Sequence, residues 1–262
     1  MKKIVIYTAL FGDYDNLHEP KDKYNNCDFV CFTDNRSLAS KNWRFIYIDV
    51  DFKQNNTLLN RHYKLFPHKY FLDYTFSIYI DSNIKILNNP YSLINKYLND
   101  ANIALPKHLE RCCLYREADI CVEYGIAKSS DVEVLINRYH KEGFPENFGL
   151  AENNIILRRH NSEEILRLME AWWKELNNGP KRDQLSLMYL MWKYKISFEL
   201  MDENSKNKNK YFTYMLHKKD LQKKTIKKFE IFINANFRKK YIYLSIKKML
   251  DIIFSIKNFI KK

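Results

Sequence analysis

Three polar residues, Asp81-Ser82-Asn83, follow an apolar run at 77–80 that is typical of a strand buried on both faces. A carboxylate at the end of such a strand is poorly solvated unless a cation meets it. A carboxylate and an amide oxygen two residues apart can bind one divalent ion, which can bridge to a diphosphate. Spacing alone favours a structural turn over a metal site, and neutral Asn83 offers less charge than a second acid would.

Two further groups of residues suit a phosphorylated ligand. Arg61 and Lys64 are three apart on a predicted helix, so both cations face one side and either meet phosphate oxygens or remain solvated. In the loop at 11–15, Gly12 lets backbone approach a ligand and Tyr14 offers a ring for stacking. The loop has neither glycine-rich nucleotide pattern, which argues against a dinucleotide enzyme and a P-loop phosphotransferase.

A second cluster consists of hydrogen-bonding side chains of both charges. Such side chains suit the recognition of hydroxyl-rich molecules. Asp183 also fits the N-terminal cap of a helix, and the two interpretations stay open. The cluster comprises His108, Arg111, Tyr115, Glu117, Glu152, Asn153, Arg182, Asp183 and Gln184.

The elements that must position these residues alternate between short β-branched runs and longer amphipathic ones. This alternation predicts an α/β fold with a mainly parallel sheet flanked by helices, in which ligands bind beyond the carboxyl ends of the strands. Strands are expected at 4–8, 28–33, 45–50, 77–81, 103–106 and 154–158, and helices at 57–65, 130–143, 161–179 and 183–194. Capping boxes are predicted at Ser130 with Glu133 and at Asn161 with Glu164.

The net charge of +13, from 44 Lys plus Arg against 31 Asp plus Glu, is concentrated at one end. Residues 218–262 hold 14 basic and 3 acidic residues, a net of +11, which leaves +2 for residues 1–217. We therefore predict a domain at 1–217 and a basic amphipathic helical tail at 218–262. The tail either lies on an anionic membrane or packs on the domain. Nucleic acid is not an expected partner.

The chain shows no signal peptide and no run of about 18 apolar residues. Its five cysteines include an adjacent pair and do not resemble a disulfide framework. These features predict a cytoplasmic protein, with the tail as a peripheral attachment to the inner face of the plasma membrane.

The ordered motifs resemble a glycosyltransferase-like family, long filed as a domain of unknown function, with members in bacterial polysaccharide loci and plant Golgi proteins. The family is similar to the GT-A glycosyltransferases. The resemblance covers about residues 3–192 and excludes the tail. It is carried by residues 7–15 (YTALFGDYD), 31–34 (CFTD), Arg61 with Lys64, 79–84 (YIDSNI) and 182–184 (RDQ).

The resemblance implies a GT-A-like fold and an enzyme that moves a sugar, such as a hexose, from a nucleotide-sugar donor, UDP-sugar above all. The acceptor would be a saccharide or a lipid-linked saccharide, in bacterial capsule or lipopolysaccharide synthesis. The nucleotide would be held by Thr8, Ala9, Tyr14, Asp34, Arg61, Lys64, Asp81 and Ser82, and the acceptor by His108, Arg111, Glu117, Asn153 and Gln184.

The resemblance also implies Mn or Mg at Asp81 and Asn83, with His217 either a further ligand or a surface histidine. Asn83 stands where GT-A enzymes usually have an acid, so the expected site offers a metal less negative charge. Asp183 first, and Glu152 second, would take the proton of the acceptor hydroxyl in an inverting enzyme, or stabilise the sugar cation in a retaining one. Two alternatives are a sugar nucleotidylyltransferase, for which the glycine-rich triphosphate loop is missing, and a non-catalytic module that binds membrane surfaces.

Overall fold

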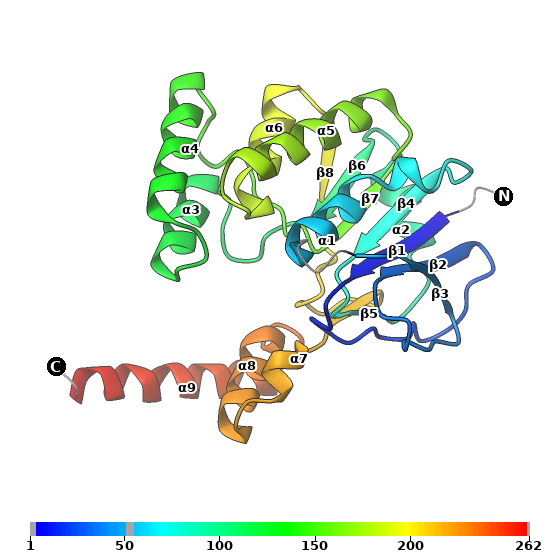
Figure 1. Ribbon diagram of the computed structural model, residues 1–262. Helices are drawn as coiled ribbons and strands as arrows, with labels where there is room; N and C mark the ends of the chain where they lie inside the picture. The colour runs from blue at the N-terminus through cyan, green and yellow to red at the C-terminus, as the bar shows by residue number, and fades with distance from the viewer. Residues whose placement is uncertain (1–3, 51–54, 261–262) are drawn as a thin grey trace.

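A mainly parallel sheet forms the centre of the molecule in this computed structural model, which describes residues 4–50 and 55–260, with backbone alone for 255–260. Seven strands within these residues pair in the order β3-β2-β1-β4-β7-β6-β8 (Figure 1). They are β1 Ile4–Leu10, β2 Cys27–Thr33, β3 Trp43–Tyr47, β4 Phe76–Ile80, β6 Ile103–Pro106, β7 Ile155–Arg158 and β8 Phe198–Met201. The predicted fold class, α/β with a mainly parallel sheet flanked by helices, is confirmed.

Strand β7 runs against its neighbours, since it pairs antiparallel with both β4 and β6, while the other paired strands of the sheet are parallel. The start of β7 therefore lies at the edge where β1, β4 and β6 end. Residues before β7 and residues after β4 consequently meet, and the backbone N–H of Asp81 donates to the carbonyl of Asn154 at 2.9 Å.

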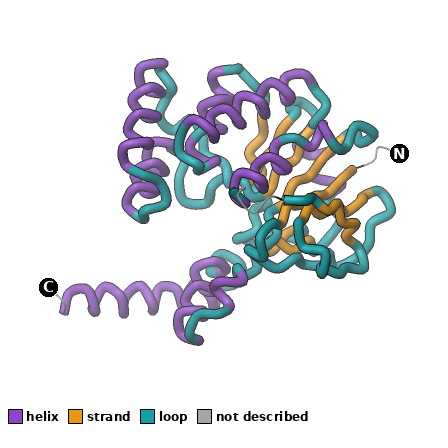
Figure 2. Tube along the Cα trace, in the orientation of Figure 1, coloured by secondary structure: helices purple, strands orange, loops and turns teal. Residues whose placement is uncertain are grey.

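Helices cover both faces of the sheet, as the layers in Figure 2 show. Side chains of β1 alternate between the faces, because Val5 and Tyr7 pack with one core and Ile4 and Ile6 with the other. The first face carries α1 Asn56–Leu65, α3 Leu114–Glu123, α4 Ser129–Glu142, α5 Glu163–Asn178 and α6 Leu187–Lys193; the second carries α2 Tyr91–Tyr97.

Smaller elements complete the described chain. Strands β5 Ile84–Ile86 and β9 Phe212–Tyr214 form a separate two-stranded sheet. The 3-10 turns are η1 Pro67–Lys69 and η2 Asp183–Leu185. The C-terminal part forms α7 Lys218–Leu221, α8 Thr225–Asn236 and α9 Tyr241–Ile260, and α9 projects away from the sheet (Figure 1).

Several predicted element ends are wrong. Helix α5 begins at Glu163 with Ser162 as its cap, and Asn161 instead donates to the carbonyls of Leu72 and Tyr74. Helix α4 begins at Ser129, so no box forms at Ser130. The expected helix at 183–194 divides into η2 and α6, and the strand expected at 45–50 ends at Tyr47. A tertiary contact therefore takes the Asn161 side chain, whereas the Ser130 hydroxyl bonds the neighbouring Asp131 carboxylate.

Candidate active site

A cavity of about 250 Å³, here called the loop cavity, lies beside the loop that follows β1. The loop turns at Gly12, whose φ is +64°, and an added Cβ there would lie 2.0 Å from Asn56 Nδ2. Only glycine fits this approach of loop to helix. Beside these two residues, the cavity is lined by Ala9, Leu10, Phe11, Tyr14, Asp15, Thr57, Asn60, Arg61, Asp81, Ser82, Asn83 and His217.

A second cavity of about 350 Å³, here called the charged cavity, opens on the other side of Asp81. All the residues that the sequence assigned to acceptor binding or catalysis line it: His108, Arg111, Glu117, Glu152, Asn153, Asp183 and Gln184. They come from the ends of β6 and β7, from α3 and from η2. The antiparallel direction of β7 brings Glu152 and Asn153 to this edge.

The two cavities share four lining residues, Arg61, Asp81, Asn83 and His217. Asp81 is partly exposed, and its carboxylate accepts a hydrogen bond from the Tyr79 hydroxyl at 3.0 Å. Burial, together with the charge of Asp81, raises the pKa of Tyr79 well above its ordinary value, so its proton stays in place to hold Asp81. A ligand that extends from one cavity to the other would pass these four residues.

His217, which lies between β9 and α7, reaches the shared wall from the C-terminal part of the chain. Its Nδ1 lies 2.5 Å from Asp15 Oδ2, and Asp15 also accepts from the backbone N–H of Lys218 at 3.1 Å. Because a carboxylate only accepts, Nδ1 carries the proton and Nε2 presents its lone pair. That nitrogen lies 3.3 Å from Asn83 Nδ2. We call this Asp15–His217 pair the clasp.

Asp81, Asn83 and His217 fit a divalent ion as a donor set, because oxygen and imidazole ligands suit Mn. The clasp adds an observation, since a histidine that binds metal usually donates its other ring N–H to a carboxylate. With a neutral amide as one member, the set offers a single carboxylate. No group of three His, Cys, Asp or Glu side chains with metal-binding arrangement occurs in the part of the chain that the structure describes.

The cations assigned to the diphosphate have a protein partner. Lys64 is 1% exposed, and its Nζ lies 2.6 Å from Asp183 Oδ2, while Arg61 Nε lies 3.5 Å from the same oxygen. Burial alone would raise the pKa of Asp183, but Arg61, Lys64 and Arg182 reverse this and hold it below its usual range. Asp183 is therefore a firmly ionised carboxylate and a weak base.

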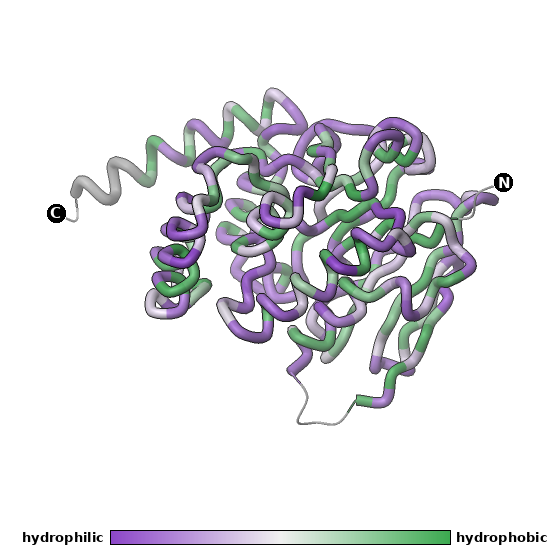
Figure 3. Tube along the Cα trace, turned by 90° about the horizontal axis from the view of Figure 1, so that it is seen from above, coloured by the Kyte–Doolittle hydropathy of each residue, from purple (hydrophilic) through white to green (hydrophobic). Residues whose placement is uncertain are grey.

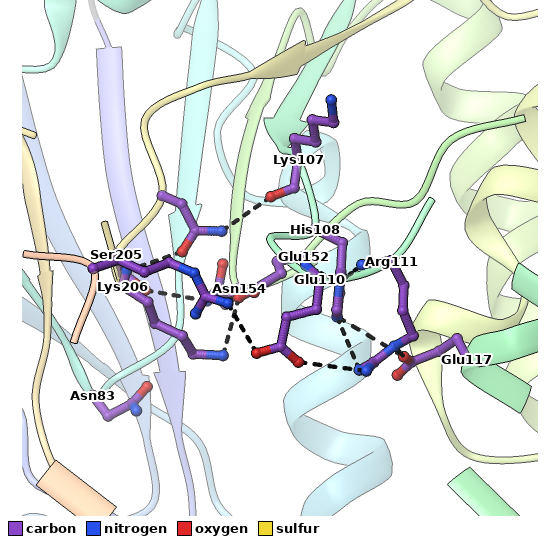
Figure 4. Close-up of polar contacts among 12 residues, drawn as sticks. Asn83, Lys107, His108, Glu110, Arg111, Glu117, Glu152, Asn154, Ser205 and Lys206 are labelled. Carbon is purple, nitrogen blue, oxygen red and sulfur yellow. Dashed lines mark hydrogen bonds and ion pairs between the residues drawn. The ribbon is translucent and has the colours of Figure 1, made fainter. Parts of the chain in front are cut away.

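Acidic and basic side chains alternate along one wall of the charged cavity (Figure 4). Arg111 Nε bonds Glu117 Oε2 at 2.6 Å, and its Nη1 lies 3.5 Å from Glu110 Oε2. Arg182 lies 3.6 Å from Glu117 on the far side, and Arg238 lies 3.0 Å from Glu110 on the near side. We call the series Arg238, Glu110, Arg111, Glu117, Arg182 the charge row.

Glu152 and Asn153, which precede β7 in the chain, differ in how many hydrogen-bond partners their side chains have. Glu152 accepts from Asn154 Nδ2 at 3.2 Å and lies 3.3 Å from Lys206 Nζ. Asn153 is 4% exposed, and neither its amide nitrogen nor its amide oxygen has a hydrogen-bond partner in the described residues. A buried amide without partners is costly, and Asn153 lines the charged cavity.

Two predicted nucleotide residues line neither cavity. Thr8 lies in β1 with 0% exposure, and Asp34 accepts from the backbone N–H of Gly12 at 3.1 Å, which fixes the loop. Of the other predicted nucleotide residues, Lys64 lines only the charged cavity, and Ala9, Tyr14 and Ser82 line only the loop cavity.

The comparison with known families decides what this site belongs to. The model of the TOD1/MUCI70 glycosyltransferase-like domain matches residues 1–219. The chain belongs to this family. The resemblance predicted from the motifs is thereby confirmed, and a glycosyltransferase is the enzyme class that the family indicates.

One relative and two solved structures are similar to this TOD1/MUCI70-type chain. The probable hexosyltransferase MUCI70 of Arabidopsis thaliana is 23% identical over 216 residues, which cover 70% of this chain and 36% of the relative, so the chain spans about a third of its length. Mouse xyloside xylosyltransferase 1 aligns with a TM-score of 0.45 at 11% identity, covering 76% of this chain and 84% of that one. The bifunctional glycosyltransferase WbbM gives 0.49 at 13% identity, covering 91% and 45%.

Sequence reasoning missed several residues of the site in this family member. Asp15 was quoted within a motif but given no role, and Lys206 and Arg238 lie in Lys- and Asn-rich stretches that resemble solvated surface. Arg182 was not missed, because the polar cluster expected from the sequence already included it beside Asp183. No local signal marks the others, because their partners are distant in sequence.

Proposed function

We propose that the protein transfers a hexosyl group from a nucleotide-sugar donor, UDP-sugar above all, to a hydroxyl of a saccharide or lipid-linked saccharide. The observation that carries the proposal is that two cavities, one beside a glycine turn and one rich in hydrogen-bonding groups, share Arg61, Asp81, Asn83 and His217. The donor diphosphate would lie at this shared wall. The nucleoside would occupy the loop cavity, with Tyr14 beside it, and the acceptor would occupy the charged cavity.

Asp81, Asn83 and His217 would hold Mn or Mg, which when bound offsets the negative charge of the departing diphosphate. Arg61 lines both cavities and would add a second positive charge there. Lys64 forms an ion pair with Asp183 and would not contact the donor. Its role would be to hold the Asp183 carboxylate in position.

Glu152, ahead of Asp183, is the carboxylate we propose as the base that takes the acceptor proton in an inverting reaction. Asp183 bonds two cations and its pKa is lowered, which reduces its basicity. Glu152 instead lies beside Asn153, whose unpartnered amide would hold the acceptor sugar. Transfer would then deliver the proton to Glu152 as the new glycosidic bond forms.

A binding panel tests the proposal. Full-length protein is titrated calorimetrically with UDP-, GDP-, ADP- and dTDP-sugars in the presence of Mn, and one donor should bind with a dissociation constant between about 1 μM and 1 mM. Asn153→Ala should lower transfer to saccharides but leave donor binding unchanged, whereas Asn178→Ala on the exposed side of α5 should alter neither. Binding of no donor would refute the proposal. Release of pyrophosphate from a nucleoside triphosphate and a sugar phosphate would favour the nucleotidylyltransferase instead.

We also propose that α9 lies on an anionic membrane surface and that the reaction is a cytoplasmic step of bacterial capsule or lipopolysaccharide synthesis. Apolar side chains of α9 are exposed, with Ile242 at 64%, Met249 at 54% and Ile253 at 40%. Figure 3 shows hydrophobic and hydrophilic positions alternating along this helix. The spacing of the three apolar residues puts them on one helix face, and Lys247 and Lys248 fall on the opposite side. Ile256 and Ile260, further along α9, lie outside the described side chains.

An anionic surface explains this helix better than a second copy of the chain. Pairing two copies would bring two segments of net charge +11 together, whereas anionic lipid attracts them. No described helix is long and apolar enough to cross a bilayer. We therefore propose that α9 is the part of the segment 218–262 that binds the membrane surface. The boundary between domain and tail after residue 217 remains a prediction.

Vesicle sedimentation tests the membrane proposal. Wild-type protein should pellet with phosphatidylglycerol vesicles and stay in solution with phosphatidylcholine alone. Ile253→Glu should abolish pelleting, while Asn178→Glu, which adds the same charge on α5, should not. If the wild-type chain does not pellet with anionic vesicles and forms dimers in sedimentation experiments, the apolar face of α9 binds a second copy of the chain.

A further inference from the structure

The segment after the family-matching region borders the charged cavity. The family model ends at residue 219, yet Asn234 of α8 and Arg238, just after α8, both line the cavity. The two side chains are four apart and so face the same way on the helix and its first following turn. This part of the chain therefore contributes to the site although it lies outside the family's domain.

Helix α8 is fixed on the body at both sides of this contact. Ile233 is 0% exposed and Asn236 is 5% exposed, so α8 is packed. Lys239 Nζ donates to Thr213 Oγ1 in β9 at 2.6 Å, and burial lowers the pKa of Lys239 to about 8. The wall formed by Asn234 and Arg238 is consequently part of the folded body, unlike projecting α9.

Arg238 forms the outer end of the charge row. Its Nη2 bonds Glu110 Oε1 at 3.0 Å, and its guanidinium lies 4.1 Å from the centroid of the Phe237 ring, which limits its orientation. The Arg238 side chain is 25% exposed and that of Glu110 is 52% exposed. A guanidinium has five N–H donors, and a carboxylate accepts several hydrogen bonds, so the pair can bind further groups while it stays formed.

We propose that Arg238 and Glu110 form an acceptor subsite that binds vicinal hydroxyls of a saccharide beyond the sugar held at Asn153. The inference rests on the proposed function and deepens it. Donors from the guanidinium and acceptors from the carboxylate match the paired donors and acceptors of neighbouring hydroxyls. Arg238 lies outside the residues that the family model matches, so the subsite would extend the site beyond that domain.

A glycan array and calorimetry together test the subsite on the full chain. Labelled wild-type protein is applied to an array of bacterial and plant surface saccharides in the presence of Mn and the nucleoside diphosphate that it binds. Arg238→Ala should weaken binding to the recognised glycans about tenfold or more, because a hydrogen bond to a charged group is lost. Glu110→Gln should act in the same direction. Arg116→Ala, an exposed arginine of α3 on the body, should match wild type.

The outcomes separate the subsite from the proposed function. Wild-type glycan binding in Arg238→Ala and in Glu110→Gln, or no glycan binding by the wild-type chain, overturns the subsite. A parallel loss of nucleotide affinity in Arg238→Ala shows a structural role and also overturns it. If Arg238→Ala fails to fold, Glu110→Gln, at a half-exposed position, decides alone. Absence of nucleotide binding in the wild type instead overturns the proposed function.

Discussion

Replacing Asp183 with asparagine would leave the buried ammonium of Lys64 without its counter-charge. The Lys64 side chain is 1% exposed and the ion pair is 2.6 Å long. Removing one partner of a buried pair costs about 3–5 kcal/mol, because the remaining charge is neither solvated nor neutralised. Arg61, with 20% of its side chain exposed, would lose less. We expect Asp183→Asn to lower the free energy of unfolding by about 3–5 kcal/mol.

Urea unfolding followed by tryptophan fluorescence measures the effect, since Lys64 Nζ lies 6.0 Å from the ring of Trp172. The double variant Lys64→Met/Asp183→Asn removes both charges and should regain most of the loss, as for other buried pairs replaced together. Asp49→Asn, which breaks the exposed pair with Arg36, should change stability little. An Asp183→Asn variant within about 1 kcal/mol of wild type would refute the reasoning, because Lys64 would then not depend on Asp183.

The same pair fixes how stability depends on pH. The pKa of Asp183 in the folded chain lies below its ordinary value of 3.8. A lowered carboxyl pKa stabilises the folded state fully above the unfolded pKa, and this stabilisation is lost as pH falls toward the folded pKa. Wild-type stability should therefore decline below about pH 5, and Asp183→Asn should lack that part of the decline.

Three further predictions concern the shared wall and the loop. Asp81→Asn should reduce turnover about a hundredfold or more, since the sole carboxylate of the metal set is lost, with little change in urea unfolding; wild-type turnover would exclude the metal role. Asp15→Asn should weaken Mn binding, measured by calorimetry, about 10- to 100-fold because His217 loses its orienting partner; equal affinity would mean that the clasp is structural. Gly12→Ala should cost about 1–2 kcal/mol of stability and weaken nucleotide binding, because φ is positive and Asn56 blocks a Cβ; an unchanged melting temperature and dissociation constant would contradict this.

Much of the site could be predicted from the sequence because strand ends are local signals. A buried apolar run that stops at Asp81 marks a strand end, and carboxyl ends of parallel strands share an edge. His108 follows β6 at the same edge, whereas Asp183 reaches the cluster from η2, far away in the chain. The roles of these residues remain predictions.

The pairing of side chains could not be predicted. Lys64 and Asp183 are 119 residues apart, and nothing near either one shows that they bond each other. The direction of β7 was equally hidden, because a strand buried on both faces has the same composition whether it runs parallel or antiparallel. The capping box predicted at Asn161 failed because that side chain bonds carbonyls distant in sequence, and the box at Ser130 failed because α4 begins one residue earlier.

The clasp has a consequence for protein synthesis. Asp15 and His217 are separated by 202 residues, so the first loop of the domain leaves the ribosome long before its partner. At about 5–20 residues per second, the interval is about 10–40 s. Throughout that time the nascent chain has the loop but lacks one side of the wall that the two cavities share. A growing chain should therefore gain its full affinity for nucleotide late, in the last steps of translation of the domain.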